Sequence, residues 1–186
     1  MNRVLVVLLA ALVLAGCEPP SSIPQGVQVY FSPHGGATDA VVNALDHATN
    51  TVLVQAYSFT SAPIAAALVA AHRRGVAVRV ILDKSQRTEK YSEADFLQHN
   101  QIPTFIDAEH AIAHNKIMVL DDYLVLTGSF NFTKAAEENN AENLLVLNDP
   151  VLAARYAENW HAHERHSEPY EREPRPERES RAGRNR

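Results

Sequence analysis

Short apolar runs alternate with amphipathic segments along residues 27–166. The runs are rich in β-branched residues, whereas in the segments between them apolar residues recur every three or four positions, which predicts strands and helices in turn. This alternation predicts an α/β domain with a layered, mixed β-sheet flanked by helices, rather than a sandwich or a helical bundle. The expected strands are Val27–Phe31, Thr51–Ser58, Val76–Leu82, Ile112–Leu120, Tyr123–Leu126 and Leu144–Leu147. The expected helices are Thr38–Ala48, Pro63–Arg74, Ala94–Asn100 and Val151–His163.

Turn-forming residues mark several of these boundaries. Pro63 suits the first turn of the helix that it opens, and Gly75 suits the end of that helix. Asp121 and Asp122 form the expected tight turn between two strands. The chain shows no internal repeat. Its length suits one globular domain, which is expected over residues 27–166.

The amino-terminal residues have the order of a secretory signal. Arg3 is followed by an uninterrupted apolar run from Val4 to Leu14, and a positive charge before an apolar core is what export machinery recognises. A spanning helix needs about 20 apolar residues, so the run is too short to remain as an anchor. A signal peptide over residues 1–16 is therefore expected.

The end of that segment carries a second signal. Residues Leu14-Ala15-Gly16-Cys17 resemble the lipobox of bacterial lipoprotein precursors, in which the cysteine is acylated. Cys17 is the only cysteine and cannot form an internal disulfide, which favours lipidation over a small buried cysteine near an ordinary cleavage site. We expect export to the periplasm or cell envelope, membrane attachment through a lipid on Cys17, and a linker over 17–26.

Residues 167–186 are expected to form a disordered charged tail. From Glu168 onward the chain is dominated by Pro, Glu, Arg, Ser and Gly, with one Ala as its only aliphatic residue. Such a segment cannot bury enough apolar surface to offset the entropy of ordering.

The charge balance restricts how the protein could bind nucleic acid. The formal net charge is −5, which argues against a generic binder of polyanions. Affinity for nucleic acid would need a local basic patch, because phosphate contacts supply most non-specific binding energy. Lys84, Arg87 and Lys90 form the only basic loop of the predicted domain and are the hypothetical rim of such a groove.

The strongest chemical signal is the order His114, one residue, Lys116, four residues, Asp121. Alternate side chains of a strand face the same way, so His114 and Lys116 are expected to project together. A lysine can hold anionic oxygens while a neutral imidazole acts as nucleophile or proton carrier near pH 7. This pair predicts attack on a phosphodiester.

Further polar groups follow downstream at expected strand ends. Gly128, Ser129 and Asn131 provide a turn, a hydroxyl and an amide that can donate hydrogen bonds to phosphate oxygens. Glu142 provides a carboxylate able to hold the second ring nitrogen of a histidine and fix its tautomer.

Together, the His114–Asp121 spacing, Gly128–Asn131 and Glu142-Asn143 resemble the signature of the phospholipase D superfamily. The resemblance covers roughly residues 27–160 and implies the phospholipase D/nuclease fold with one motif per chain. Within the superfamily, the chain looks most like the small bacterial endonucleases, and the segments that carry this likeness are Phe31-Ser32-Pro33, Gln55–Thr60, the Ala-rich helix into Arg74-Gly75-Val76, and Phe130–Glu137.

The resemblance implies a mechanism with no metal ion and no other cofactor. His114 would attack phosphorus to form a phosphohistidine, while a second histidine protonates the leaving oxygen. Lys116 and Asn131 would hold the phosphate, Ser129 would assist, and Glu142 would orient the imidazole and stabilise its charge. Large family members carry two motifs and this chain carries one, so the resemblance implies a homodimer in which each subunit donates a histidine to a shared cleft.

Asp121 and the remaining histidines are expected to have non-catalytic roles. Asp121 begins a turn, so structural support is favoured over catalysis. His161, His163 and His166 lie on or beyond the last expected helix, where a solvated helix end is favoured over a zinc site. His110 lies outside the motif and is assigned no role.

Three functions are compatible with these residues. The first is an endonuclease that cleaves DNA, with RNA as an open alternative. The second is a phospholipase D acting on phospholipid headgroups, because the same histidine chemistry serves both substrates. The third is a non-catalytic surface lipoprotein that binds phosphate polymers. The chain lacks an obvious interfacial aromatic patch, which favours the nuclease.

Overall fold

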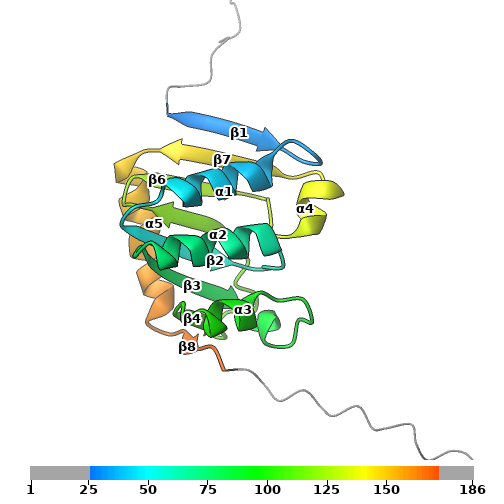
Figure 1. The fold of residues 1–186 in the computed structure, drawn as a ribbon. Coiled ribbons are helices and arrows are strands. Elements are labelled where there is room, and N and C mark those ends of the chain that lie inside the picture. Colours follow the sequence, from blue (N-terminus) through cyan, green and yellow to red (C-terminus); the bar gives the residue numbers. More distant parts are fainter. Residues whose placement is uncertain (1–25, 172–186) are drawn as a thin grey trace, which may run out of the picture.

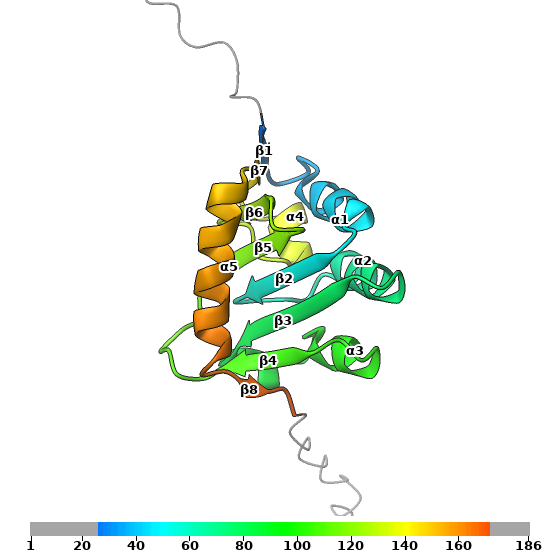
Figure 2. The ribbon, with the colours of Figure 1, turned by 90° about the vertical axis from the view of Figure 1, so that its left-hand side faces the viewer.

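The computed structural model describes residues 26–171, in which one β-sheet lies between two layers of helices (Figures 1 and 2). This arrangement confirms the expected mixed sheet flanked by helices. Among the described residues, no helix is long and apolar enough to cross a bilayer. On one face lie α1 (Ala37–His47), α2 (Ala62–Arg73) and α3 (Ala94–His99), and along the other lies α5 (Pro150–Glu164).

Several predictions concern residues outside this range. The signal peptide over 1–16, the lipidated Cys17, the linker over 17–26 except its last residue, and the tail from residue 172 onward lie outside the described residues.

The sheet has eight strands in the order β1-β7-β6-β5-β2-β3-β4-β8. The pairs β2–β3 and β3–β4 are parallel, and the other pairs are antiparallel. Parallel neighbours need a crossover, which α2 and α3 provide. The strands are β1 (Val27–Phe31), β2 (Thr51–Ala56), β3 (Ala77–Asp83), β4 (Thr104–Asp107), β5 (Lys116–Leu120), β6 (Leu124–Gly128), β7 (Asn143–Asn148) and β8 (Glu168–Pro169). The short helices are the 3-10 helix η1 (Lys84–Arg87) and α4 (Lys134–Glu138).

Both faces of the central strands are apolar because helices cover both. On β2, Val52 and Val54 belong to the core under α1 and α2, whereas Leu53 belongs to the core under α5. Trp160 of α5 is fully buried in this second core, and its indole Nε1 donates a hydrogen bond to the backbone oxygen of Val54 at 2.8 Å. Side-chain alternation along one strand therefore fills two cores.

The strand predicted over Ile112–Leu120 begins only at Lys116. Residues 112–115 are irregular, and the backbone N–H of Ala113 donates to the Asp83 carboxylate at 2.8 Å, which holds this segment at the end of β3. His114 therefore lies on the loop that enters β5 and not on the strand itself.

The sequence prediction misses β4 and α4. β4 has four residues directly after Pro103, and α4 has five, so neither shows a full hydrophobic period. Thr133 is the N-cap of α4, and its side-chain oxygen accepts a hydrogen bond from the N–H of Ala136 at 3.1 Å. Such an N-cap stabilises a short helix that its own length would not.

The expected start of the disordered tail at residue 167 is wrong. Glu168 pairs with Ile106 of β4, and the N–H of Tyr170 donates to the Thr104 oxygen at 2.8 Å. The Tyr170 side chain is buried against the core. Burial of Tyr170 and pairing with the edge of β4 thus order a segment whose composition alone predicts disorder.

Asp121 supports the turn after β5. Asp121 and Asp122 both have positive φ, 50° and 60°, as the predicted tight turn requires. The Asp121 carboxylate accepts hydrogen bonds from N and Oγ1 of Thr49 and from N of Asn50 and Thr51, all at 2.8–2.9 Å. Burial would raise the pKa of Asp121, but these hydrogen bonds outweigh it and lower the pKa.

We expect Asp121→Asn to lower the free energy of unfolding by about 1–3 kcal/mol, because the amide cannot accept all four hydrogen bonds. A carboxyl whose pKa is lower in the folded than in the unfolded protein stabilises the fold at pH values above its unfolded pKa of ~3.9. This contribution to the free energy of unfolding is lost as the pH falls through the folded pKa. Urea unfolding should therefore show the deficit at pH 7 and a smaller one at acid pH. Asp122→Asn is the matched control, and an equal deficit in that variant would contradict the role of Asp121.

Candidate active site

A cavity of about 330 Å³ lies at one end of the central strands, where β2 and β6 end and β5 and β7 begin. Antiparallel pairing brings these four strand ends to one place. The cavity contains all five residues that were predicted to act on a phosphodiester. It is lined by His114, Lys116, Gly128, Ser129, Asn131 and Glu142.

His114 and Lys116 are in direct contact. The Lys116 Nζ lies 3.0 Å from His114 Nδ1 and 2.7 Å from the His114 backbone oxygen. An ammonium has no lone pair, so it can hydrogen bond only to an unprotonated Nδ1. A neutral ring that accepts through Nδ1 carries its proton on Nε2.

The Lys116 side chain is buried, with 7% of the residue exposed, whereas His114 is exposed to solvent. Tyr57, at the end of β2, packs its ring 4.5 Å from the His114 ring and 5.1 Å from the Lys116 ammonium. Burial lowers the pKa of Lys116, and the negative charge of Glu142 opposes that shift. The site therefore presents a partly desolvated cation beside an accessible imidazole.

Gly128 and Ser129 form a tight turn against β7. Gly128 has φ +152°, and a Cβ at this position would lie 2.2 Å from the backbone oxygen of Asn143. The turn therefore requires glycine. Ser129 Oγ accepts hydrogen bonds from N and Nδ2 of Asn143 at 3.0 and 3.3 Å, so its own O–H remains available as a donor.

Asn131 has a buried side-chain oxygen without a hydrogen-bond partner among the described residues. An unsatisfied buried amide oxygen is costly, and this one belongs to a residue that lines the cavity. A ligand or a rearrangement that satisfies it would be stabilised.

Glu142 lines the same cavity, but its carboxylate accepts a hydrogen bond from Asn140 Nδ2 at 3.2 Å. Its backbone is held by Ser32, whose Oγ accepts from the Glu142 N–H and whose N–H donates to the Glu142 oxygen. Among the described residues, no hydrogen bond joins this carboxylate to the His114 ring. The orienting role of Glu142 stays a prediction.

Sequence reasoning missed two supporting residues of the site. Asp83 is 3% exposed and holds the segment before His114 through the Ala113 N–H. Ser32 holds the backbone of Glu142. An aspartate directly after a buried strand was the available signal for Asp83, whereas the pairing of Ser32 with Glu142 depends on the β1–β7 register.

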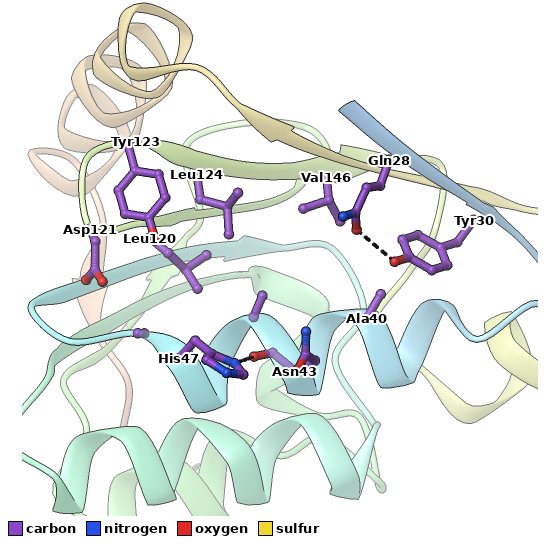
Figure 3. Close-up of a pocket in the computed structure, with 12 residues that line it drawn as sticks. Gln28, Tyr30, Ala40, Asn43, His47, Leu120, Asp121, Tyr123, Leu124 and Val146 are labelled. Carbon is purple, nitrogen blue, oxygen red and sulfur yellow. Dashed lines mark hydrogen bonds between the residues drawn. The ribbon is translucent and has the colours of Figure 1, made fainter. Parts of the chain in front are cut away.

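A second cavity of about 190 Å³ lies between α1 and the sheet, near Asp121 (Figure 3). Tyr30 and Gln28 are hydrogen bonded to each other across its rim at 2.9 Å, and His47 Nδ1 contacts the Asn43 oxygen at 2.7 Å. None of the five predicted catalytic or phosphate-binding residues lines this cavity, so it is not the catalytic site.

Comparison with known proteins agrees with this geometry. The family described as "Cardiolipin synthase, PLD-like domain" matches residues 41–163. The chain belongs to the phospholipase D superfamily. As a member, it is a phosphodiesterase, and the resemblance stated from its motifs is confirmed.

Individual members of the superfamily are similar over most of the domain. A protein named phospholipase D from Rickettsia conorii is 42% identical over 134 residues, which are 72% of this chain and 67% of that protein. The crystal structure of Nuc, a phospholipase D family member from Salmonella typhimurium, is 41% identical with a TM-score of 0.74, covering 77% of this chain and 97% of that chain. NucT from Helicobacter pylori shares the fold, with a TM-score of 0.71 at 23% identity over 77% of this chain and 98% of that chain.

The expectation of a solvated helix end is wrong for two of the three C-terminal histidines. His163 Nδ1 and His110 Nδ1 lie 2.8 and 3.0 Å from Asp107 Oδ2, and His166 Nε2 lies 3.3 Å from the same oxygen. Burial would raise the pKa of Asp107, but the hydrogen bonds from the imidazoles outweigh it and lower the pKa well below its ordinary value. Only His161 keeps the expected surroundings, beside Glu164 at 3.2 Å.

Proposed function

We propose that this phosphodiesterase is a metal-independent endonuclease that cleaves DNA with little sequence preference, with RNA as the other nucleic acid to be tested. The observation that carries the proposal is the 3.0 Å contact between Lys116 Nζ and His114 Nδ1 in a cavity shared with Ser129, Asn131 and Glu142. Attack on an anionic phosphodiester requires a nucleophile beside a fixed cation.

The proposed reaction has two steps. In the first, the Nε2 lone pair of His114 forms a bond to phosphorus, the bond from phosphorus to the leaving oxygen breaks, and that oxygen takes a proton from a second imidazole. In the second, water attacks the phosphohistidine, the second imidazole accepts the proton of the water, and the phosphorus–nitrogen bond breaks. Lys116, Ser129 and the Asn131 amide donate hydrogen bonds to the non-bridging oxygens.

Substrate binding has to move one proton on the His114 ring. When Nδ1 accepts from the Lys116 ammonium, a neutral ring carries its proton on Nε2. Attack through Nε2 requires the proton on Nδ1. A phosphate that draws the Lys116 ammonium away releases Nδ1, and the Glu142 carboxylate in the same cavity then accepts its N–H.

The second imidazole is proposed to come from a partner subunit, because the described residues place only one histidine, His114, in the cavity. Each subunit of a symmetric dimer would contribute one ring to a shared cleft. Light scattering should therefore give twice the mass of the chain. Adding an excess of His114→Ala protein, under conditions where subunits exchange, should suppress wild-type activity in proportion to the mixed dimers. Full activity in a monomer would contradict the shared cleft.

The nuclease is favoured over the phospholipase by the character of the cavity. No apolar side chain lines it, and His114 and Ser129 are exposed, so a phosphodiester within a long polar polymer can reach the ring. The basic loop gives weaker support than expected, because Arg87 pairs with Glu168 and Lys84 donates to the His110 oxygen. Lipid turnover remains the second candidate, since the relative from Rickettsia conorii is named phospholipase D.

Location at the cell envelope is part of the same proposal. Cleavage after Gly16 and acylation of Cys17 would attach the enzyme to a membrane, where several acyl chains hold a protein stably. Cells labelled with a fatty acid should incorporate it into the wild-type chain and not into Cys17→Ser. Equal incorporation in both would contradict the anchor.

A substrate panel tests the function directly. Plasmid DNA, single-stranded RNA and phosphatidylcholine vesicles are incubated with wild-type and His114→Ala protein in the presence of a chelator. The proposal expects nicked and linear plasmid with wild type alone and little free choline. Choline release with intact plasmid would reverse the order of the two candidates, and no turnover of any substrate would favour a non-catalytic lipoprotein.

Glu142→Gln is expected to move the alkaline limb of kcat/KM to lower pH. The Lys116 ammonium is required to hold phosphate, so activity is present below its pKa and lost as pH rises through it. Burial lowers this pKa and the Glu142 charge raises it, so removal of the charge lowers it further. A pH profile measures the shift, and Glu138→Gln on α4, an exposed carboxylate beside Lys134, should leave the limb in place. An unshifted limb in Glu142→Gln would contradict the coupling.

A further inference from the structure

Four residues with metal-binding side chains converge at the end of β4, apart from the catalytic cavity. Asp107 ends β4, His110 follows in the next loop, and His163 and His166 lie at the end of α5 and just beyond it. Each offers one ligand atom, and these atoms all lie within 4.8 Å of one another. None of the four lines the cavity that holds His114.

The distances suit a small tetrahedral site. The Asp107 Oδ2 lies 2.8, 3.0 and 3.3 Å from ring nitrogens of His163, His110 and His166. Ligands placed 2.0–2.1 Å from a zinc ion at tetrahedral corners are separated by about 3.4 Å. The four ligand atoms all lie within 4.8 Å of one another. The side chain of His110 is 45% exposed on a loop and that of His166 is 27% exposed, so small rotations of these rings can bring the ligand atoms to the tetrahedral spacing.

The His166 ring supplies a second observation that points to a cation site. Its Nε2 is buried and makes no well-directed hydrogen bond among the described residues, although it lies 3.3 Å from the Asp107 carboxylate. Its Nδ1 lies 3.4 Å from the Glu109 carboxylate, which favours the ring proton on that side. The Nε2 atom points at the Asp107 oxygen, so a cation held between the two atoms would be coordinated by both. A carboxylate on the outer nitrogen is also the common second partner of a metal-bound histidine.

The three rings are packed closely around a single buried charge. Their centroids are 4.9–5.3 Å apart, and Asp107 has no exposed side-chain surface. Three imidazolium charges at this separation would repel one another, whereas three neutral rings are good ligands.

We propose that Asp107, His110, His163 and His166 bind one Zn²⁺ ion as a structural site. Imidazole and carboxylate ligands suit zinc, whereas Ca²⁺ and Mg²⁺ prefer sets of oxygen ligands. Four protein ligands close a tetrahedral zinc site and leave no position for a reacting water. The site is independent of the proposed phosphodiester chemistry, which uses no metal.

The position of the site gives the ion a role in the fold. It would join the end of β4 to the end of α5, two elements that contact each other, and the loop that leads to His114 starts at this end of β4. The same loop is already held at its other end, where Ala113 donates to Asp83. Zinc would therefore secure both ends of the segment that positions the nucleophile.

The test uses the full chain without a histidine tag, stripped with a chelator and then mixed with zinc chloride. Elemental analysis after gel filtration should give about one zinc per chain, and zinc should raise the Tm by about 5 °C or more at saturation. Cobalt chloride should give the visible absorption of a tetrahedral site, and magnesium chloride should change nothing. Asp107→Asn and His163→Ala should lose the bound zinc and the Tm rise, whereas His161→Ala, on the same helix but outside the cluster, should keep both.

His110→Ala keeps the test decisive if the more buried variants fail to fold, because this ring is half-exposed on a loop. It should weaken zinc binding by more than the about 10–100-fold that loss of an outer partner costs. Wild-type protein that retains no zinc, or zinc retained unchanged in His110→Ala and Asp107→Asn, would overturn the proposal and leave Asp107 as a hydrogen-bond acceptor for the three rings. The zinc test is read from metal content and Tm, whereas the nuclease test is read from His114-dependent cleavage of plasmid, so failure of the zinc site and failure of the nuclease are distinguishable.

Discussion

Replacement of His114 by alanine is expected to lower kcat/KM for phosphodiester hydrolysis by about 10⁴-fold or more, equivalent to about 5.5 kcal/mol of transition-state stabilisation. The proposed covalent step needs an imidazole, and His114 is the only imidazole that the described residues place in the cavity. The side chain is exposed, so its removal should leave the Tm nearly unchanged.

The loss can be assigned to the ring by two controls. His47→Ala removes another exposed histidine, at the end of α1, whose Nδ1 contacts the Asn43 oxygen of the same helix. This variant should keep wild-type activity. Rapid quenching of the wild-type reaction should trap a phosphorylated chain that is absent from His114→Ala. Wild-type rates in His114→Ala would remove the enzyme interpretation altogether.

Lys116→Met is expected to be the second most damaging change, with a loss of about 10²–10³-fold in kcat/KM, because it removes the cation that faces the phosphate while keeping the length of the side chain. Lys116→Arg should not restore full activity. The lysine is 7% exposed and surrounded by His114 and the Tyr57 ring, so a planar guanidinium cannot occupy the same space.

Stability separates this effect from misfolding. Lys116 is buried without an ion pair among the described residues, and replacing a buried charge by an apolar group of similar size is often neutral or stabilising. Thermal unfolding of Lys116→Met should therefore give a Tm equal to or above that of wild type. A variant that unfolds early and loses activity in the same proportion would show that the lysine acts through the fold instead.

The residues that line the candidate site were predictable because they lie in short, ordered motifs. His114 and Lys116 are two positions apart, and Gly128, Ser129 and Asn131 span four, so local backbone geometry already groups them. Strong periodicity likewise predicted α1, α2 and α5 and the central strands. The argument for His114 was partly wrong, because the residue precedes β5, yet its contact with Lys116 was as expected.

The errors occurred where a contact joins segments distant in the chain. The buried Tyr170 and the pairing of Glu168 with Ile106 order a segment whose composition predicts disorder. His163 and His166 were expected in solvent because Asp107, more than fifty residues earlier, carries no local sign of their approach. β4 was missed for a different reason, because its four residues show no hydrophobic period of their own.

The sequence by itself determined the fold class, the family and the residues that line the candidate site, because strand and helix periods and the spacing within a motif are local properties of the chain. The tertiary structure decided that the described residues place one imidazole in the cavity and that Asp107 lies beside three histidines. It also decided that Asp83 holds the backbone before His114 and that Ser32 holds the backbone of Glu142. Those features depend on which strands become neighbours and on where α5 ends against β4. The strand order and the position of α5 follow from burying the two cores together, and no short stretch of sequence specifies them.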